Sequence, residues 1–193
     1  MARSDTQSAS ISELARTPQV RLNGPIAQDS LDSFLDQLGK LGAGEEPIAV
    51  EVTTTGGDAE IGRRLALEVK LARERLKRRL VFIGKTVVYS AGATVMGGFP
   101  REDRYLTEDA VLLIHCRKLS KDLALDGPLR ALRIELEQVI SEIDMGLTLQ
   151  QEGYDALIRG SSVSIDEVTS KAEHGWYIQA PEAVERGLVA GLV

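Results

Sequence analysis

The sequence is poor in the residues from which several kinds of functional site are built. Its 193 residues include one cysteine, Cys116, and two histidines, His115 and His174. A single cysteine excludes an internal disulfide framework and is typical of a reducing compartment. A zinc site of ordinary ligand count would need more cysteine and histidine than this. The sequence therefore predicts no metal site and implies no cofactor.

Long apolar runs and a surplus of positive charge are lacking as well. No stretch reaches the roughly 18 apolar residues of a membrane span, and residues 1–8 lack the apolar core of a secretory signal. The formal net charge of −6 argues against a nucleic-acid partner, because phosphate contacts need a basic face. We therefore expect a cytoplasmic protein with neither a nucleic-acid nor a membrane partner. Residues 1–17 are small and polar, so we expect a flexible N-terminal arm before a single domain over 18–193.

The apolar segments that are present alternate between two patterns. β-Branched and apolar runs predict strands at 47–52, 80–83 and 110–115, and amphipathic patterns predict helices at 31–41 and 58–79. Strands that alternate with helices favour a parallel sheet covered by helices. The sequence therefore predicts an α/β fold.

One serine stands where a predicted strand passes into a predicted helix. Small residues crowd around Ser90 within residues 87–98. A tight turn of this kind exposes the serine hydroxyl, and the start of the following helix supplies backbone N–H groups and the positive end of a dipole. Ser90 is therefore either a nucleophile or simply the N-cap of that helix.

Two further strand ends favour the nucleophile. The strand at 47–52 runs into a Gly-Gly turn at Gly56 and Gly57, and the strand at 110–115 ends in His115. Acyl transfer requires backbone donors for an oxyanion, a nucleophile, and a base that accepts the nucleophile's proton. The chain offers these three parts in that order.

Four segments resemble the proteolytic subunit of the Clp protease, which belongs to the larger ClpP/crotonase superfamily. They are Thr54–Gly57, similar to the family's Ser-Pro-Gly-Gly turn; Tyr89–Ala93, similar to Ala-Ser-Met-Gly-Ala; Leu113–His115, similar to Met-Ile-His; and Gln179–Val189, similar to the C-terminal Pro-Glu-Ala-Val-Glu-Tyr-Gly-Leu-Val. The resemblance covers the chain from about Gln19 to its end.

The resemblance implies a ClpP/crotonase-like fold of repeated β-α units, with a parallel sheet and a protruding handle helix. It also implies a serine endopeptidase that cleaves unfolded polypeptides inside an oligomeric chamber. Ser90 would be the nucleophile, His115 the base, and the N–H groups of Gly57 and Ala91 the oxyanion hole. Subunits of this family form a homo-oligomeric ring or double ring, usually fed by an ATP-driven unfoldase. Because the chain has no Gly-x-x-x-x-Gly-Lys-Ser/Thr motif, such an ATPase would be a separate partner.

A long helix is predicted from Pro128 to about Gln151, at the position of the family's handle. Proline suits the first turn of a helix. The helix carries a broader apolar stripe than a lone surface helix needs: Leu129, Leu132, Leu136, Val139, Ile140, Ile143 and Leu147. The stripe packs either on its own domain or on a second ring of subunits, and we favour the second.

The sequence departs from the family at the third catalytic position. The family's aspartate falls on Gly175, so the acid that would orient His115 is missing from its usual place. Glu173 is the first candidate to replace it, followed by His174 and by Asp58 from another loop. By themselves, Glu173 and His174 are better explained as residues of a solvated turn.

The missing acid keeps two other functions open. The chain could be a catalytically weak or inactive ClpP-like ring or scaffold subunit, or a crotonase-type enzyme that acts on acyl-CoA thioesters. Cys116 and Arg117 stand where the family has Gln-Pro, which changes the wall of the substrate groove. Neighbours on a strand point to opposite faces, so we expect Cys116 to be a buried thiol that does not share a site with His115.

Overall fold

The computed structural model describes residues 10–42 and 44–193. In chain order its elements are α1 (Ile11–Arg16), β1 (Val20–Asn23), α2 (Gln28–Gly39), β2 (Ile48–Thr54), α3 (Ala59–Leu76), β3 (Leu80–Tyr89), α4 (Ala91–Gly97), the 3-10 helix η1 (Arg101–Asp103), β4 (Arg104–Leu106), β5 (Val111–Ile114), α5 (Leu129–Ile158), α6 (Ile165–Ala172), β6 (Trp176–Gln179), α7 (Ala180–Glu185) and β7 (Gly191–Leu192).

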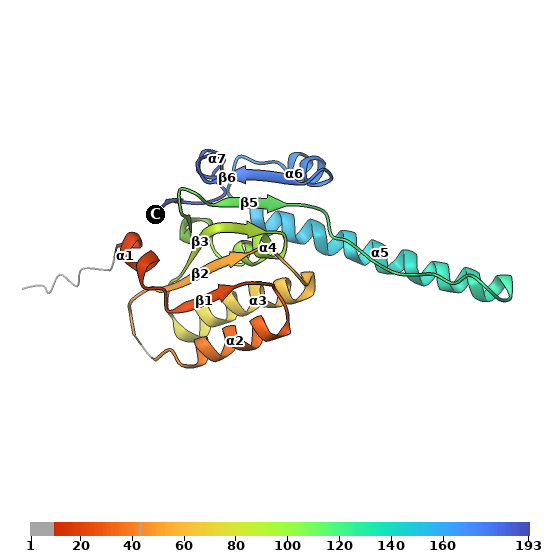
Figure 1. Ribbon diagram of the computed structural model, residues 1–193, viewed down its shortest axis with the longest axis horizontal. Helices are drawn as coiled ribbons and strands as arrows, with labels where there is room; N and C mark the ends of the chain where they lie inside the picture. Colours follow the sequence, from red (N-terminus) through yellow and green to blue (C-terminus); the bar gives the residue numbers. More distant parts are fainter. Residues whose placement is uncertain (1–9, 43) are drawn as a thin grey trace, which may run out of the picture.

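The strands form one sheet in which all pairs but one are parallel. The order is β1-β2-β3-β4-β7, while β5 pairs with the second half of β3 and carries β6 on its other side. Only the β5–β6 pair is antiparallel among the described strands. The predicted α/β fold with a parallel sheet is confirmed, and Figure 1 shows the helices arranged along it.

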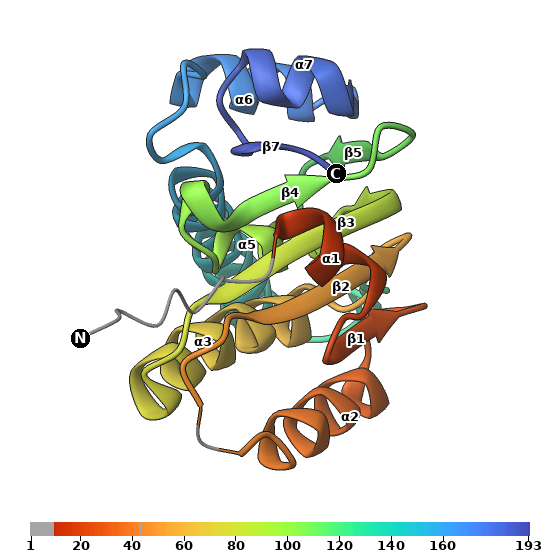
Figure 2. The same ribbon diagram turned by 90° about the vertical axis from the view of Figure 1, so that its left-hand side faces the viewer.

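Both faces of the central strands are buried. Successive residues of a strand point to opposite faces. Val50 and Phe82 therefore belong to the main core with α2 and α3, whereas Ala49 and Val81 pack with Leu14 of α1. Figure 2 shows α1 on one side of the sheet and α2 and α3 on the other.

The expected N-terminal arm is helical in the part that the structure describes. Residues 1–9 lie outside the described residues. At the start of α1, Ser10 Oγ accepts the N–H of Glu13 at 3.3 Å, and the Glu13 carboxylate accepts the N–H of Ser10 at 2.9 Å. Lys85 Nζ then donates to the carbonyl of Ala15 at 2.8 Å and ties the helix to the sheet. The expectation of flexibility rested on composition and overlooked this capping box.

Three neighbouring strands deliver their carboxyl ends to one edge of the sheet. β2 pairs with β3, and β3 pairs with β5. Gly56 and Gly57 follow β2, Ser90 follows β3, and His115 follows β5. In open α/β sheets, ligands bind outside the carboxyl ends of the strands. The fold therefore places the three predicted parts of an acyl-transfer site together.

Helix α5 is longer than the sequence pattern indicated and projects from the body of the molecule (Figure 1). It runs to Ile158, beyond the predicted end near Gln151, and only its last turns are buried, at Tyr154 and Leu157. Along the projecting part the large apolar side chains are exposed: Leu129, Ile134, Leu136, Ile140, Ile143, Met145 and Leu147. None of the described helices has the length and apolar content to cross a bilayer.

Candidate active site

Ser90 adopts a backbone conformation that is rare for a residue with a side chain. Its φ is 56° and its ψ is −116°, a region in which strain amounts to about 1–3 kcal/mol. The Ser90 N–H donates to the Leu113 carbonyl at 2.8 Å, and the Ser90 carbonyl accepts the N–H of Ala93 at 2.9 Å. These bonds hold the turn in place. The Ser90 side chain makes no capping hydrogen bond to α4, so the geometry gives no support to the N-cap alternative.

The crowd of small residues around Ser90 reflects close packing between two loops. A β-carbon at Gly56 would lie 2.6 Å from Ser90 Cβ, and one at Gly92 would lie 2.5 Å from Thr54 Cγ2. Gly56 also has a φ of +101°, which favours glycine. Larger residues at either position would push the turn after β2 away from Ser90.

Two backbone N–H groups flank Ser90. Gly57 forms a parallel bridge with Ile26, and the hydrogen bonds of this bridge use the N–H groups of Ile26 and Asp58. The N–H of Gly57 is therefore not bound to Ile26. Ala91 is the first residue of α4, and N–H groups in the first turn have no partner within their helix. Both Gly57 and Ala91 line the same cavity as Ser90.

His115 lies on the same cavity, at the start of a segment without regular structure. Its Nδ1 is 2.6 Å from the carbonyl oxygen of Cys116. A carbonyl can only accept a hydrogen bond, so Nδ1 carries the hydrogen of the neutral ring and Nε2 keeps the lone pair. Within the described chain, no hydrogen bond joins His115 to Ser90.

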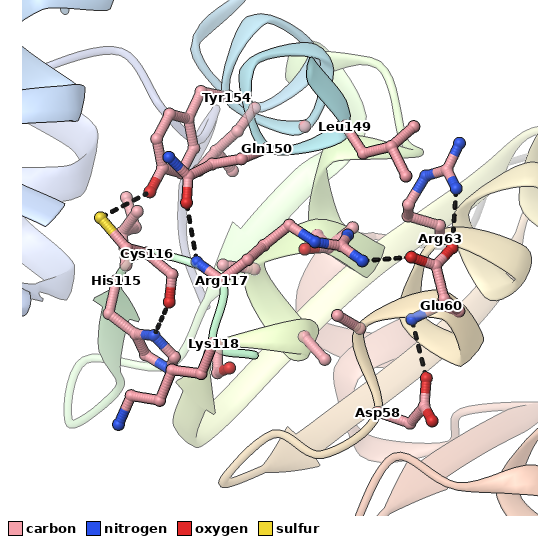
Figure 3. A pocket seen from close by; sticks show the side chains of 18 of the residues that line it. Asp58, Glu60, Arg63, His115, Cys116, Arg117, Lys118, Leu149, Gln150 and Tyr154 are labelled. Carbon is pink, nitrogen blue, oxygen red and sulfur yellow. Dashed lines mark hydrogen bonds and ion pairs between the residues drawn. The ribbon is translucent and has the colours of Figure 1, made fainter. Parts of the chain in front are cut away.

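The cavity has a volume of about 560 Å³ and is formed by five parts of the chain. They are the turn after β2, the first turn of α3, α4, the segment after β5, and the last turns of α5 (Figure 3). Tyr154 and Leu157 form part of its wall. They were not predicted, because the sequence pattern placed the end of the helix near Gln151. Their spacing continues the apolar stripe from Leu147, and that signal could have located them.

The candidates for a third catalytic residue are not equally placed. Glu173 is the C-cap of α6, with its N–H bonded to the Thr169 carbonyl. Glu173 and His174 are both exposed, and neither is among the residues that line the cavity. Asp58 does line it. The structure therefore does not bring Glu173 to Ser90 and His115, because helix α6 ends with that side chain in solvent.

The Asp58 carboxylate caps α3, and the backbone conformation at Gly175 favours glycine. The Asp58 carboxylate accepts the N–H of Glu60 at 2.7 Å and of Ile61 at 3.0 Å, which caps α3. Gly175 has a φ of +78°, in the region that residues with a side chain rarely adopt. In residues 10–42 and 44–193, no group of three His, Cys, Asp or Glu side chains is placed to hold a metal ion.

Cys116 and His115 both line the cavity, although their side chains point apart (Figure 3). Cys116 Sγ faces the Tyr154 hydroxyl at 3.9 Å. Burial is the largest cause that raises the pKa of Tyr154, and the neighbouring Cys116 raises it further. Cys116 is half-buried rather than fully buried, because it follows the end of β5 instead of lying within the strand.

An ion-pair network crosses the cavity opposite His115. Glu60 bonds Arg63 at 2.7 Å and also pairs with Arg117, which reaches across from the segment after β5. Partial burial acts to raise the pKa of Glu60, but the hydrogen bonds and charges of the two arginines outweigh it, so that pKa lies below its ordinary value. The side chain of Gln150 accepts the N–H of Arg117 at 2.7 Å. Glu60 and Gln150 were not predicted as site residues, because no local motif marks them.

Comparison with known proteins gives one consistent result. The family model described as Clp protease matches residues 2–193. The ATP-dependent Clp protease proteolytic subunit 2 of Treponema pallidum is 27% identical over 192 residues, covering 97% of this chain and 87% of that protein. The proteolytic subunit 3 of Rhizobium etli is 24% identical over 181 residues, covering 93% of this chain and 86% of that protein.

A solved structure supports the same fold. A ClpP1 mutant from Listeria monocytogenes aligns with a TM-score of 0.68 and covers 94% of each chain. The sequences of this pair are 18% identical, so the likeness concerns the fold alone.

Proposed function

The chain belongs to the Clp protease family, and on that premise we propose that it is a serine endopeptidase that cleaves unfolded polypeptides. The observation that carries the proposal is the conformation of Ser90. Its positive φ, the absence of a side-chain capping bond, and its place on the cavity with His115 are what a nucleophile requires. A serine that only capped the start of α4 would not need a strained backbone.

The proposed reaction follows from the placement of these groups. Ser90 Oγ attacks the carbonyl carbon of the scissile peptide bond, and His115 Nε2 accepts the hydroxyl proton. The N–H groups of Gly57 and Ala91 stabilise the negative oxygen of the tetrahedral intermediate. His115 then donates the proton to the leaving amine, and water hydrolyses the acyl-serine by the same steps. Substrate binding draws Ser90 and His115 into hydrogen-bond contact, as is common when the free enzyme shows this contact open.

The Cys116 carbonyl takes over part of the role of the missing acid. An aspartate fixes the histidine tautomer and stabilises the imidazolium. The Cys116 carbonyl accepts from Nδ1 at 2.6 Å and fixes the tautomer in the same sense. It carries no full charge, so it stabilises the imidazolium less. The proposed enzyme is therefore active but slow.

Assembly into a ring or double ring, with a separate ATP-driven unfoldase, is the second part of the proposal. The names of the Treponema pallidum and Rhizobium etli relatives describe ATP-dependent proteases. The exposed apolar side of α5 supplies a surface that a second subunit would cover.

A non-catalytic ring or scaffold subunit is the second candidate function. Two observations favour it: the positive φ at Gly175, which disfavours an acid there, and the lack of a hydrogen bond between Ser90 and His115 within the described chain. The retained strain at Ser90 favours the enzyme, because a scaffold has no need of it.

Reaction with a fluorophosphonate probe, followed by mass spectrometry, separates the two candidates. We expect an adduct on Ser90 in the native protein and none in Ser90→Ala. In His115→Ala the labelling rate should fall by about 10³-fold or more, since the nucleophile loses its base. His174→Ala is the matched control, because it removes the other histidine at an exposed position, and it should label normally. Failure of the intact oligomer to label would support the non-catalytic subunit.

A further inference from the structure

The wall of the cavity beside Ser90 carries an arginine in an unusual setting. Arg117 is two residues beyond His115, and its side chain is 24% exposed, whereas that of its partner Glu60 is 56% exposed. The cationic side chain is thus the more buried member of the pair. Figure 3 shows Arg117 extending across the cavity from the His115 side towards α3.

The backbone of Arg117 is anchored independently of the ion pair. Its N–H donates to Gln150 Oε1 at 2.7 Å, which joins the segment after β5 to α5. Loss of the Glu60 contact would therefore leave this backbone anchor in place beside the cavity. Glu60 would keep Arg63, which it bonds at 2.7 Å.

Positive charge predominates on this part of the cavity. The lining includes three cationic side chains and two carboxylates: Arg63, Arg117 and Lys118, and Asp58 and Glu60. The Asp58 carboxylate is occupied by the N-terminal N–H groups of α3. Glu60 is therefore the carboxylate that contacts both arginines, from a largely exposed position, and Arg63 also pairs with Glu152 at 4.0 Å.

We infer that this part of the cavity binds an acidic side chain of the substrate next to the scissile bond. Arg117 is the specificity-determining residue, and Glu60 is its resident partner, which an incoming carboxylate displaces. The inference rests on the proposed function, because it assumes that the cavity holds substrate beside Ser90.

The energetics of charged pairs support this exchange. An ion pair with an exposed partner is weak, so little is lost when Glu60 gives way. An apolar side chain that displaced Glu60 would leave the Arg117 side chain, which is only 24% exposed, without its carboxylate partner, and this is costly. A substrate carboxylate instead accepts a charge-assisted, bidentate hydrogen bond from the Arg117 guanidinium. Leu149 and Tyr154 provide apolar surface for the methylene groups of a glutamate side chain.

Peptidyl-coumarin substrates that differ only in the residue before the cleaved bond test the inference. With glutamate, glutamine, leucine and lysine compared, we expect kcat/KM for glutamate to exceed that for its neutral isostere glutamine by about tenfold or more. Arg117→Gln should abolish this preference or reverse it. Glu60→Gln should increase the preference for glutamate, because no resident carboxylate then competes with the substrate for Arg117. The matched control is Lys121→Gln, on the same segment as Arg117. It breaks an ion pair of 2.5 Å with Glu142 of α5 and should leave the preference unchanged.

Binding measurements separate this inference from the proposed function. Ser90→Ala protein is titrated with C-terminally amidated peptides that contain glutamate or glutamine, so that the side-chain carboxylate is the single difference. A tenfold preference for glutamate that Arg117→Gln removes supports the acidic subsite, even if the native protein does not react with the fluorophosphonate probe. Equal binding of the two peptides, together with normal labelling of Ser90, overturns the subsite and leaves the peptidase in place. Stronger binding of the glutamine peptide overturns it as well.

Discussion

The two halves of the cavity are built in different ways. On the serine side, Ser90 is fixed by backbone hydrogen bonds and by contact with Gly56, and both belong to turns at the ends of central strands. On the histidine side, His115 begins a stretch of residues 115–126 without regular structure, held to α5 through Arg117 and Gln150. The nucleophile is preorganised by the sheet, whereas the base and the substrate wall depend on a loop and a projecting helix.

This difference suggests where control of activity would lie. A strained turn in the sheet changes little when subunits assemble, because the strands on both sides are buried. A loop held mainly by single hydrogen bonds and partly exposed ion pairs, such as those of Arg117 and Lys121, moves more readily than the sheet. Docking of α5 onto a partner would therefore act on His115 and Arg117 before it acted on Ser90.

The largest expected effect comes from a change on the serine side. Gly56→Ala places a β-carbon 2.6 Å from Ser90 Cβ and forces a residue with a side chain to a φ of +101°. The turn must then shift, and a displacement of about 1 Å at a reacting atom can lower a rate about 10²-fold. We expect at least this loss in the rate of fluorophosphonate labelling, measured by mass spectrometry over time.

A second glycine supplies the control for this experiment. A β-carbon at Gly146, within α5, would meet nothing within 4 Å. Gly146→Ala should leave the labelling rate unchanged and stabilise the helix by up to about 1 kcal/mol. Labelling of Gly56→Ala at the native rate would show that the serine side is as adaptable as the histidine side.

The same contrast separates what the sequence could predict from what it could not. Ser90, His115 and Gly57 each follow a strand, and strands leave a period and composition that can be recognised. Parallel pairing then brings their ends together without further information. Glu173 was a poorer choice, because its position depends on where α6 ends and on the direction of one exposed side chain.

Long-range contacts of single side chains left no pattern in the sequence. Glu60 and Arg117 lie far apart in the chain, and each is unremarkable among its charged neighbours. The capping box at Ser10 and Glu13 was visible in principle, because a serine followed three residues later by a glutamate precedes an apolar run. The composition of residues 1–17 outweighed it.

A smaller effect is expected at the empty acid position on the histidine side. Gly175→Asp and Gly175→Asn both force a side chain to a φ of +78°, so both should lower the free energy of unfolding by about 1–2 kcal/mol. Because His115 Nδ1 is already engaged by the Cys116 carbonyl, we expect the aspartate to label no faster than the asparagine. Chemical denaturation and labelling rates measure the two effects.

The comparison of these two variants isolates the charge from the strain. In a His174→Gln background, one histidine remains, and its nitrogen chemical shifts report the tautomer directly. A hydrogen on Nδ1 in the glycine, asparagine and aspartate forms would agree with the Cys116 contact. Labelling at least tenfold faster in Gly175→Asp than in Gly175→Asn would instead show that an acid at position 175 can act as the third catalytic residue.

The smallest effect concerns the ion pair that joins the histidine side to α3. The pKa of Glu60 is below its ordinary value of 4.5, so the stability contributed by its arginine contacts is present above that pH. It is lost as the pH falls through the lower, folded-state pKa. The native protein should therefore exceed Glu60→Gln in unfolding free energy at pH 7 by no more than about 1 kcal/mol, because solvent screens a half-exposed carboxylate. Once the pH is below the folded-state pKa of Glu60, the difference should vanish. A double-mutant cycle with Arg117→Gln assigns the coupling to this pair. A coupling well above this limit would mean that Glu60 locks the histidine side too firmly for a substrate carboxylate to displace it, and the two halves of the cavity would then be equally rigid.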